Sequence, residues 1–365
     1  MGRTVIICKE FPELSIMFTG SLPFSQATAP YIALAPMEGL MDATLRDVLT
    51  QVGGIDHCVT EFIRITQQVL PSRVFKRFCP ELEQGGLTRS GTPVHVQLLG
   101  SDASLMAENA AKVAMLGAPA IDLNFGCPAK TVNKSQGGAV LLQYPEQLHR
   151  IADAVRRAVP SHIPVSAKMR LGFHDKSLAI TNAQALADAG IQWLTVHART
   201  KTEGYKPPAY WSWIAQVREH IHIPVLANGE IWTPEQAQQC QHESQSNLLM
   251  IGRGLVATPD LALQIKAITA GQSANAEPWQ THLQRFQQLA EQLTHLTDRQ
   301  LTDRLKQWLH YFSLQSNEIS WVFQQVKREK EKMAFFNAID QAIEQLVTDP
   351  TRLATHRYQY EHSGF

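Results

Sequence analysis

The sequence lacks the cysteine pattern of a disulfide-bonded or zinc-binding protein. It has five cysteines, an odd number, and no two of them are spaced as a C-x-x-C pair. Disulfide-rich secreted domains carry even numbers of cysteines, and structural zinc sites use closely spaced pairs. We therefore expect free thiols, no metal site and a reducing compartment, namely the cytoplasm.

Long apolar runs are also missing. No stretch approaches the roughly 18 consecutive apolar residues that a membrane-spanning helix needs. Residues 4–8 are apolar, but this run is too short for the core of a signal peptide, and the acidic Glu10 and Glu13 follow it. We expect no association with a membrane, and we interpret residues 1–28 as an extension of unknown role.

A third absence is an excess of charge of either sign. The chain has 33 Lys and Arg residues against 33 Asp and Glu residues, so its formal net charge is zero. Proteins that bind nucleic acid often carry a basic excess. Composition alone therefore does not indicate a nucleic-acid partner, although a local basic surface remains compatible with one.

What the sequence does contain is an alternation of short apolar runs with helical patterns. The runs that we expect to be strands are residues 31–35, 57–62, 94–99, 120–123, 165–169, 193–197, 225–227 and 248–251. Helical spacing is clearest over 148–159, and Thr233-Pro234 and Thr258-Pro259 each place an N-cap oxygen before a proline suited to a first helical turn. Strands that alternate with helices predict parallel pairing.

Eight such units predict an α/β fold of the (β/α)8 TIM-barrel type. The alternative is an open doubly wound sheet, which usually has a G-x-G-x-x-G turn after its first strand. Residues 35–39 read Ala-Pro-Met-Glu-Gly at that point and do not match this turn. The barrel is therefore the favoured architecture.

The pattern changes near residues 271–275, which read Gly-Gln-Ser-Ala-Asn. Strand-like runs end there, and residues with helical periodicity follow. We expect three parts: the extension 1–28, a barrel domain 29–270 and an all-helical domain 271–365. The run 327–332 mixes charges of both signs, which favours a solvated helix face over a binding patch.

Polar and glycine-rich segments follow the predicted strands at their carboxyl ends, where barrels carry function. Asn228-Gly229-Glu230 and Gly252-Arg253-Gly254 follow the last two strands. Barrels often bind phosphate there through backbone N–H groups, and Arg253 adds a charged donor. Two tight turns without a ligand are the alternative, but their pairing favours phosphate.

Cys127 is the best candidate for chemistry. It lies in a loop between Gly126 and Pro128, with Lys168 and Arg170 expected nearby. A thiol there can act as nucleophile or acid, whereas most buried cysteines only pack, as we expect of Cys58 and Cys240.

Three further polar residues are expected to face a ligand. Gln97 and Lys168 lie inside predicted strands, and His197 ends one. Burial of such groups is costly unless they are paired, so a bound polar ligand is a natural partner. A salt bridge between Lys168 and Glu38 is the structural alternative for that lysine.

Six ordered motifs together resemble the tRNA-dihydrouridine synthases. They are residues 35–39, 122–128 (Asp-Leu-Asn-Phe-Gly-Cys-Pro), 168–172 (Lys-Met-Arg-Leu-Gly), 197–200 (His-Ala-Arg-Thr), 227–231 (Ala-Asn-Gly-Glu-Ile) and 251–254 (Ile-Gly-Arg-Gly). The resemblance covers residues 31–263 and continues more weakly through the helical part. Residues 60–64, 130–133 and 304–309 look closest to the bacterial C-type branch, which reduces uridine 16 of the D loop.

This resemblance implies a barrel that binds FMN, a helical tRNA-binding domain, NADPH or NADH as reductant, and a monomer. It implies Cys127 as the acid that protonates C5 of uracil after hydride transfer to C6. It implies FMN contacts from Pro36, Met37, Glu38, Gln97, Lys168, His197, Asn228, Gly229, Glu230, Gly252 and Arg253. It implies tRNA contacts from Arg64, Asn124, Arg170, Arg304, Lys306 and Tyr311.

One departure is Phe125, where the family often has a small residue, and we expect its bulk to narrow the pocket.

Two rival functions remain open at this point. One is a flavin barrel that acts on a free pyrimidine, as dihydroorotate or dihydropyrimidine dehydrogenases do, which does not need the helical domain. The other is a tRNA-binding barrel without catalysis, against which Cys127 and the two glycine-rich loops argue. A visible absorption spectrum separates these classes, because bound oxidised flavin is yellow.

Overall fold

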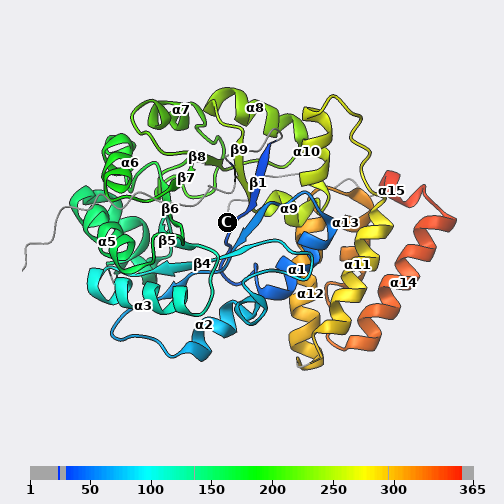
Figure 1. The fold of residues 1–365 in the computed structure, drawn as a ribbon. Helices are drawn as coiled ribbons and strands as arrows, with labels where there is room; N and C mark the ends of the chain where they lie inside the picture. The colour runs from blue at the N-terminus through cyan, green and yellow to red at the C-terminus, as the bar shows by residue number, and fades with distance from the viewer. Residues whose placement is uncertain (1–23, 25–29, 135, 295, 356–365) are drawn as a thin grey trace, which may run out of the picture.

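Parallel strands close into a barrel in the computed structural model, which describes residues 24, 30–134, 136–294 and 296–355 (Figure 1). The order around the barrel is β2-β1-β9-β8-β7-β6-β5-β4, and pairing of β2 with β4 closes it. The predicted (β/α)8 barrel is therefore confirmed. The strands are β1 Tyr31–Leu34, β2 His57–Val59, β3 Ile63–Arg64, β4 Val94–Leu99, β5 Ile121–Phe125, β6 Val165–Arg170, β7 Trp193–His197, β8 Val225–Asn228 and β9 Leu248–Ile251.

The second barrel strand differs from the prediction because it is interrupted. We expected one strand over 57–62, but β2 ends at Val59 and β3 begins at Ile63, both paired with β4. Between them, the hydroxyl of Thr60 accepts the backbone N–H of Gln97 at 3.0 Å. A side-chain oxygen there accepts an N–H that a regular parallel ladder would pair with a backbone carbonyl.

Helices lie on the outside of the barrel and at the carboxyl ends of its strands. They are α1 Ala43–Val52, α2 Ser72–Phe78, α3 Ala103–Met115, α4 Lys130–Lys134, α5 Pro145–Ala158, α6 Ala179–Asp188, α7 Ser212–Glu219, α8 Pro234–Ser244, α9 Arg253–Ala257 and α10 Leu261–Thr269. Two 3₁₀ turns, η1 Pro80–Gln84 and η2 Gly138–Gln143, lie between them. The predicted helix over 148–159 is confirmed by α5, which buries Leu148, Ile151, Ala152 and Val155.

One of the two predicted helix starts is right and the other is wrong. Thr233 caps α8 and accepts the N–H of Gln236. Thr258 does not cap α10, which begins at Leu261, because Thr258 ends α9 and donates its own N–H to the carbonyl of Gly254 at 2.8 Å. The Thr-Pro pair therefore lies in a turn that joins two helices.

The barrel interior follows the two-residue alternation of its strands. At the amino ends of the strands, His57 stacks on His95 with ring centroids 4.2 Å apart. Phe24 packs edge-on against Tyr31 and Trp193 beside this pair, at 5.5 and 5.6 Å between ring centroids. Phe24 is the part of the extension that the structure describes, and it is buried against this end of the barrel.

A helical region follows the barrel and lies beside it, from yellow to red in Figure 1. It comprises α11 Trp279–Gln292, α12 Asp298–Phe312, α13 Asn317–Val326, α14 Lys332–Thr348 and α15 Arg352–Thr355. Helix α12 packs against α9, and α11 packs against α1. The mixed-charge run 327–332 is largely exposed as expected, but it forms the turn between α13 and α14 instead of a helix face.

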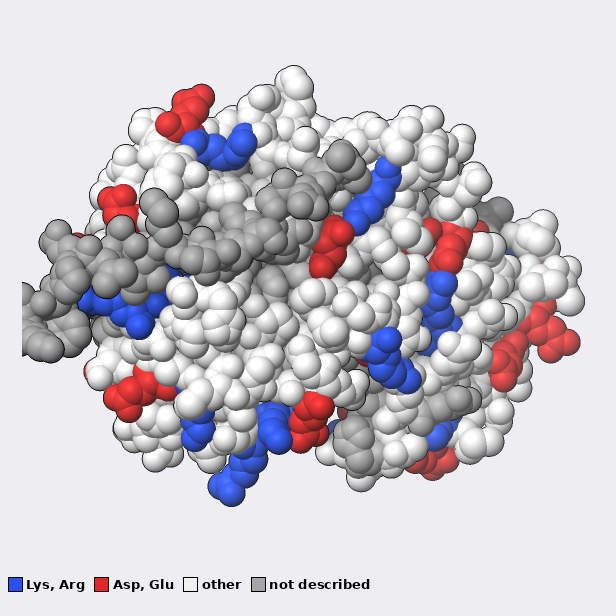
Figure 2. All heavy atoms as spheres, in the orientation of Figure 1, with Lys and Arg blue, Asp and Glu red and all other residues white. Residues whose placement is uncertain are grey.

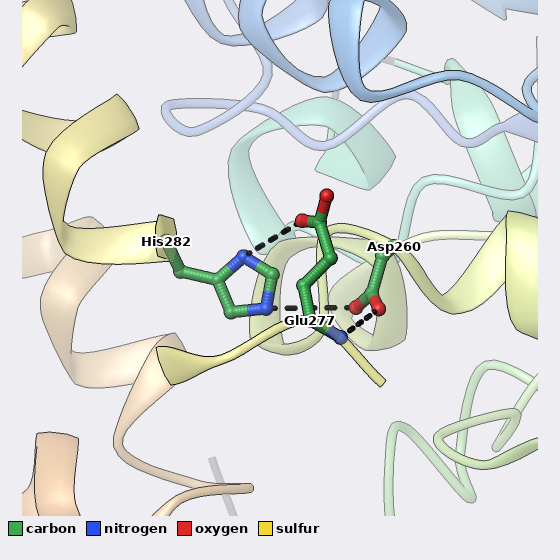
Figure 3. A group of neighbouring side chains, drawn as sticks. All are labelled: Asp260, Glu277 and His282. Carbon is green, nitrogen blue, oxygen red and sulfur yellow. Dashed lines mark hydrogen bonds and ion pairs between the residues drawn. The ribbon is translucent and has the colours of Figure 1, made fainter. Parts of the chain in front are cut away.

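An ion-pair cluster joins the barrel to the helical region (Figure 3). Asp260 precedes α10, Glu277 lies in the connecting segment and His282 lies on α11, with ring nitrogens of His282 3.5 and 3.7 Å from the two carboxylates. Arg285 binds both oxygens of Glu277. Because that guanidinium occupies Glu277 and would repel a cation, the geometry favours ion pairing over metal binding.

Charges of both signs are interspersed over the face seen in Figure 2, without a broad patch of either sign. The described part of the chain contains no helix with the length and apolar character required to cross a membrane. The described cysteines Cys58, Cys79, Cys127 and Cys240 are free and buried, and Cys8 lies outside the described residues.

Candidate active site

A cavity of about 630 Å³ opens at the carboxyl ends of the barrel strands. All eleven residues that were expected to bind FMN line it, together with Cys127, Asn124 and Arg170. Helix α12 contributes Gln307 and Tyr311 to the same lining. The structure thus brings together side chains from strands and loops that lie far apart in the sequence.

A buried hydrogen-bond chain leads from the barrel core to the cysteine loop. Ser166 Oγ and Gln97 Nε2 each donate to the carboxylate of Asp122 at 2.6 Å. Asn124 Nδ2 donates to Gln97 Oε1 at 2.8 Å, and Asn124 Oδ1 accepts the N–H groups of Gly126 and Cys127 at 2.9 Å each. The position of Cys127 is therefore fixed by residues of β4 and β5.

The surroundings of Cys127 favour the protonated form of its thiol. Burial raises its pKa and the carboxylate of Glu38 raises it further, while the backbone N–H of Ala129 and the cations Arg170 and Arg64 lower it less. A thiol whose pKa lies above its usual value is a weak nucleophile at neutral pH but remains a proton donor. This environment suits an acid better than an attacking thiolate.

Lys168 is a partly buried cation that lines the cavity. Its ammonium donates to Asn228 Oδ1 at 3.0 Å, and Asn228 Nδ2 donates to the carbonyl of Met250 at 2.7 Å. The alternative salt bridge to Glu38 is not formed. Burial, reinforced by the nearby Arg170, lowers the pKa of Lys168 to about 8.

His197 presents a polar atom that lacks a partner. Its Nδ1 is buried without a hydrogen bond, and burial together with nearby cations lowers its pKa well below the usual value. The neutral ring lines the cavity. A buried polar atom without a partner is costly, so this atom points to a ligand that supplies the missing hydrogen bond.

The two glycine-rich loops after β8 and β9 are held by a charged and aromatic cluster. Arg199, fully buried, forms an ion pair with Glu230, which also accepts Trp232 Nε1–H at 3.1 Å. The guanidinium of Arg253 lies 5.0 Å from the ring centroids of both Tyr205 and Trp232, with 30% of its side chain exposed. Arg253 is thereby oriented by two aromatic rings.

Glycine is required at particular points of these loops. A Cβ on Gly254 would lie 2.1 Å from the carbonyl oxygen of Ile231, which is a backbone clash. Gly229 has a φ of +124°, and its carbonyl accepts Trp211 Nε1–H at 2.8 Å. A close backbone approach thus requires glycine at position 254, and a left-handed φ favours it at position 229.

The residues expected to contact tRNA fall into different settings. Arg64 is exposed at the rim, and one of its nitrogens lies 3.3 Å from the carbonyl of Thr131. Arg170 is buried and donates to the carbonyls of Gly126, Thr200 and Gly204. The side chains of Arg304 and Lys306 are 17% and 14% exposed, and they pair with Asp42 and Asp303. Their contact with tRNA stays a prediction.

One sequence expectation about the pocket is wrong. Phe125 does not narrow the cavity, because it is buried in the hydrophobic core and is not among the lining residues. On β5, Asp122 and Asn124 take part in the interior network, so Phe125 projects to the other side of the strand.

Sequence reasoning missed Tyr205, Trp232 and Gln307, which all line the cavity. Trp232 follows Glu230 by two residues, and Tyr205 lies in the long segment after β7, so their closeness to the expected loops was an available signal. Gln307 lies in the segment 304–309 that resembles the bacterial C-type branch, but that segment does not indicate a place at the cavity, to which the docking of α12 brings it.

Comparison with solved structures supports the fold. Histamine dehydrogenase from Rhizobium sp. 4-9 superposes with a TM-score of 0.50 at 13% sequence identity, over 71% of this chain and 48% of that chain. At this identity the likeness shows the fold alone.

Comparison with sequences is far more specific. The chain is 53% identical to a tRNA-dihydrouridine(16) synthase of Aquipseudomonas alcaligenes, over 82% of this chain and 96% of that protein. It is 46% identical to one from Shewanella oneidensis, over 85% and 98%, and 45% identical to one from Neisseria meningitidis serogroup B, over 82% and 91%. The profile of the family "Dihydrouridine synthase (Dus)" matches residues 33–347. The chain therefore belongs to the dihydrouridine synthase family of flavin-dependent oxidoreductases.

Proposed function

We propose that the protein uses FMN and NADPH to reduce uridine 16 in the D loop of tRNA to dihydrouridine, with Cys127 as the acid. The observation that carries this proposal is that the protonated thiol of Cys127 lines the same cavity as all the expected FMN residues. The relatives at 45–53% identity are named for the reaction at position 16, which supports the same position here.

The residues of the cavity fit FMN. His197 Nδ1 is buried without a partner, Lys168 offers an ammonium next to Asn228, and Arg253 stands beside two glycine-rich loops that suit a phosphate. In this proposal Arg253, Gly252 and Gly229 hold the phosphate, while Lys168, Gln97 and His197 contact the polar edge of the ring system. Pro36, Met37 and Glu38 close the cavity on the side of β1.

The chain's own part in the reaction is orientation and proton transfer. FMN, when bound and reduced, would supply the hydride for C6 of uracil, and the C5 carbon would then need a proton. The Cys127 thiol donates that proton, and the hydrogen bonds that Gly126 and Cys127 donate to Asn124 Oδ1 fix its loop while it does so. The raised pKa keeps the thiol protonated until the base arrives, as general acid catalysis requires.

A uridine inside folded tRNA must leave its stack to reach such a cavity. Arg170 and Asn124 line the cavity and offer donors for the carbonyl groups of a uracil ring. The helical region, which contributes Tyr311 to the lining, would face the rest of the tRNA together with Arg64, Arg304 and Lys306. A monomer in the cytoplasm with NADPH or NADH as reductant stays our prediction.

The rival activity on a free pyrimidine has less support. It leaves α11–α15 without a role, although α12 forms part of the cavity wall. A barrel that binds tRNA without catalysis would not need a protonated cysteine beside the expected flavin residues.

The test is reconstitution with unmodified tRNA. The purified protein is expected to be yellow, to release FMN on denaturation, and to form dihydrouridine at position 16 when NADPH is added. Dihydrouridine at another position would overturn the assignment of the site, and reduction of free uracil or orotate in preference to tRNA would favour the rival. A colourless protein that does not bind added FMN would overturn the proposal as a whole.

A further inference from the structure

A contact from the helical region reaches the loop that follows β1. Arg304 of α12 donates from Nη1 to the carbonyl of Gly39 at 2.6 Å and from Nη2 to the carbonyl of Leu40 at 2.8 Å. The same nitrogen Nη2 lies 2.5 Å from Asp42 Oδ2. Gln307, one turn further along α12, donates to the carbonyl of Gly39 at 3.0 Å.

The loop is held from its other side by the barrel. Glu61 accepts the N–H of Gly39 at 2.5 Å, so both polar groups of this one residue are bound by side chains. Gly39 has a φ of +73° and marks the point where the chain turns back. Asp42 also caps α1 through the N–H of Leu45 at 2.9 Å, which links the contact to the start of that helix.

This loop forms one wall of the cavity. Pro36, Met37, Glu38 and Leu40 all line it, and Met37 accepts the N–H groups of Leu40 and Met41 through its carbonyl. The shape of the wall therefore depends on the turn that Arg304 holds. The guanidinium itself is not among the lining residues and lies over the ring of Trp308 at 5.1 Å.

We propose that Arg304 is a positioning residue that holds the loop after β1 in the shape that binds FMN, so that the helical region controls the cofactor site of the barrel. This inference rests on the proposed function, because it takes the cavity as the FMN site. Arginine suits the task since its planar fork can bind two carbonyls and a carboxylate at once. A residue that only contacts tRNA would have no reason to place its donors on the barrel backbone.

The test compares Arg304→Ala with Arg299→Ala. Arg299 lies on the same helix, and its side chain is 78% exposed and paired with Asp303, so it controls for the loss of a positive charge and for helix propensity. FMN affinity of the apoproteins is measured by quenching of FMN fluorescence, and hydrogen exchange of the Leu40 and Met41 amides is followed by mass spectrometry. We expect Arg304→Ala to weaken FMN binding about tenfold and to speed exchange in this loop, and Arg299→Ala to change neither.

A conservative variant separates positioning from general stability. Arg304→Lys keeps the charge but not the fork, so it should recover part of the FMN affinity and part of the amide protection. Unchanged FMN affinity and unchanged loop exchange in Arg304→Ala, with a raised KM for tRNA alone, would overturn the inference and leave Arg304 as a tRNA contact. Faster exchange throughout α11–α14 would also overturn it, because Arg304 would then hold the helical region itself. Failure of the wild-type protein to bind FMN would instead count against the proposed function.

Discussion

The side-chain oxygen of Asn124 and the backbone nitrogen of Cys127 are 2.9 Å apart, with Asn124 as the acceptor. Because the amide of Asn124 also donates to Gln97, which donates to Asp122, the proposed acid is connected to the middle of the barrel. The loop is thus fixed by buried side chains of β4 and β5. Such support is what keeps a proton donor within reach of its target.

Replacement of Cys127 by alanine should abolish the proton transfer while leaving the cofactor in place. We expect Cys127→Ala to purify with FMN and to be reduced normally by NADPH. Its single-turnover oxidation by tRNA should be slower by about 10²–10⁴-fold, the usual scale for a general acid. Wild-type rates of this step would remove Cys127 from the mechanism. Release of FMN from the variant would instead show that the thiol is needed for cofactor binding.

Lys168 should lower the free energy of unfolding of the apoprotein and raise the affinity of the protein for FMN. Its pKa is lowered to about 8 from a usual value near 10.5, so the folded state binds fewer protons than the unfolded state between these values. The free energy of unfolding should therefore rise with pH across this interval, and the penalty should be fully present below pH 8. We expect Lys168→Met to stabilise the apoprotein at pH 7, to flatten this rise and to weaken FMN binding.

Denaturant titrations at pH 7 and pH 10 measure both effects, with Lys327→Met as the control at an exposed lysine outside the cavity. An apoprotein that loses stability in Lys168→Met would show that the lysine is well paired without a ligand.

Arg253→Ala should weaken FMN binding by about 1.5–3 kcal/mol, the scale of a hydrogen bond to a charged group. The reason is its position between Tyr205 and Trp232 at the loop after β9. Equilibrium dialysis of the apoprotein with FMN gives the dissociation constant. Arg157→Ala, which removes an exposed guanidinium on α5, serves as the reference. An unchanged constant would refute the assignment of Arg253 to the phosphate.

Acid should weaken the ion pairs of Glu277 that join the barrel to the helical region, and so destabilise the protein. The hydrogen bonds from Arg285 lower the pKa of Glu277 more than burial raises it, so the carboxylate contributes stability that is present above its usual pKa of 4.5. That stability is lost as the pH falls through the lower pKa of the folded state. We expect Glu277→Gln to lower the free energy of unfolding at pH 7 by about 1 kcal/mol, the scale for a partly exposed pair. Between pH 6 and pH 3, this variant should lose less stability than the wild type.

The comparison for this prediction is Glu83→Gln, at an exposed pair with Lys76 on the barrel. Melting temperatures across the pH range distinguish the two variants. Parallel curves for the wild type and Glu277→Gln would show that the cluster in Figure 3 does not govern acid sensitivity.

Much of the fold was predictable because local pattern and burial agree in a barrel. Each apolar run between helical stretches forms a strand in the structure. Strands of a parallel barrel are buried on both faces, so their sequences are short, continuous apolar runs that can be recognised. The interruption at Thr60 was not predictable, because it depends on a hydrogen bond to Gln97 on another strand. The helix start predicted at Thr258 is wrong for a similar reason, because Thr258 forms the C-cap of α9 and not the N-cap of the next helix.

The candidate site was predictable for residues that directly follow the barrel strands, because the carboxyl ends of the strands surround the cavity. Residues just after strands reached the cavity, as Cys127 and Arg253 show. The roles of Arg304 and Gln307 depend instead on how α12 docks, which brings them to Gly39 from more than 260 positions away. No local pattern records such a contact.

The packing of Phe24 against Tyr31 and Trp193 has an electrical consequence. It closes the amino end of the barrel with aromatic side chains, and there the stacked rings of His57 and His95 stay uncharged because burial lowers the pKa of both. Solvent can then screen the cavity only from its mouth. An anion placed there experiences the positive charges of Lys168 and Arg170 through protein of low polarisability, where their attraction is several times stronger than through water.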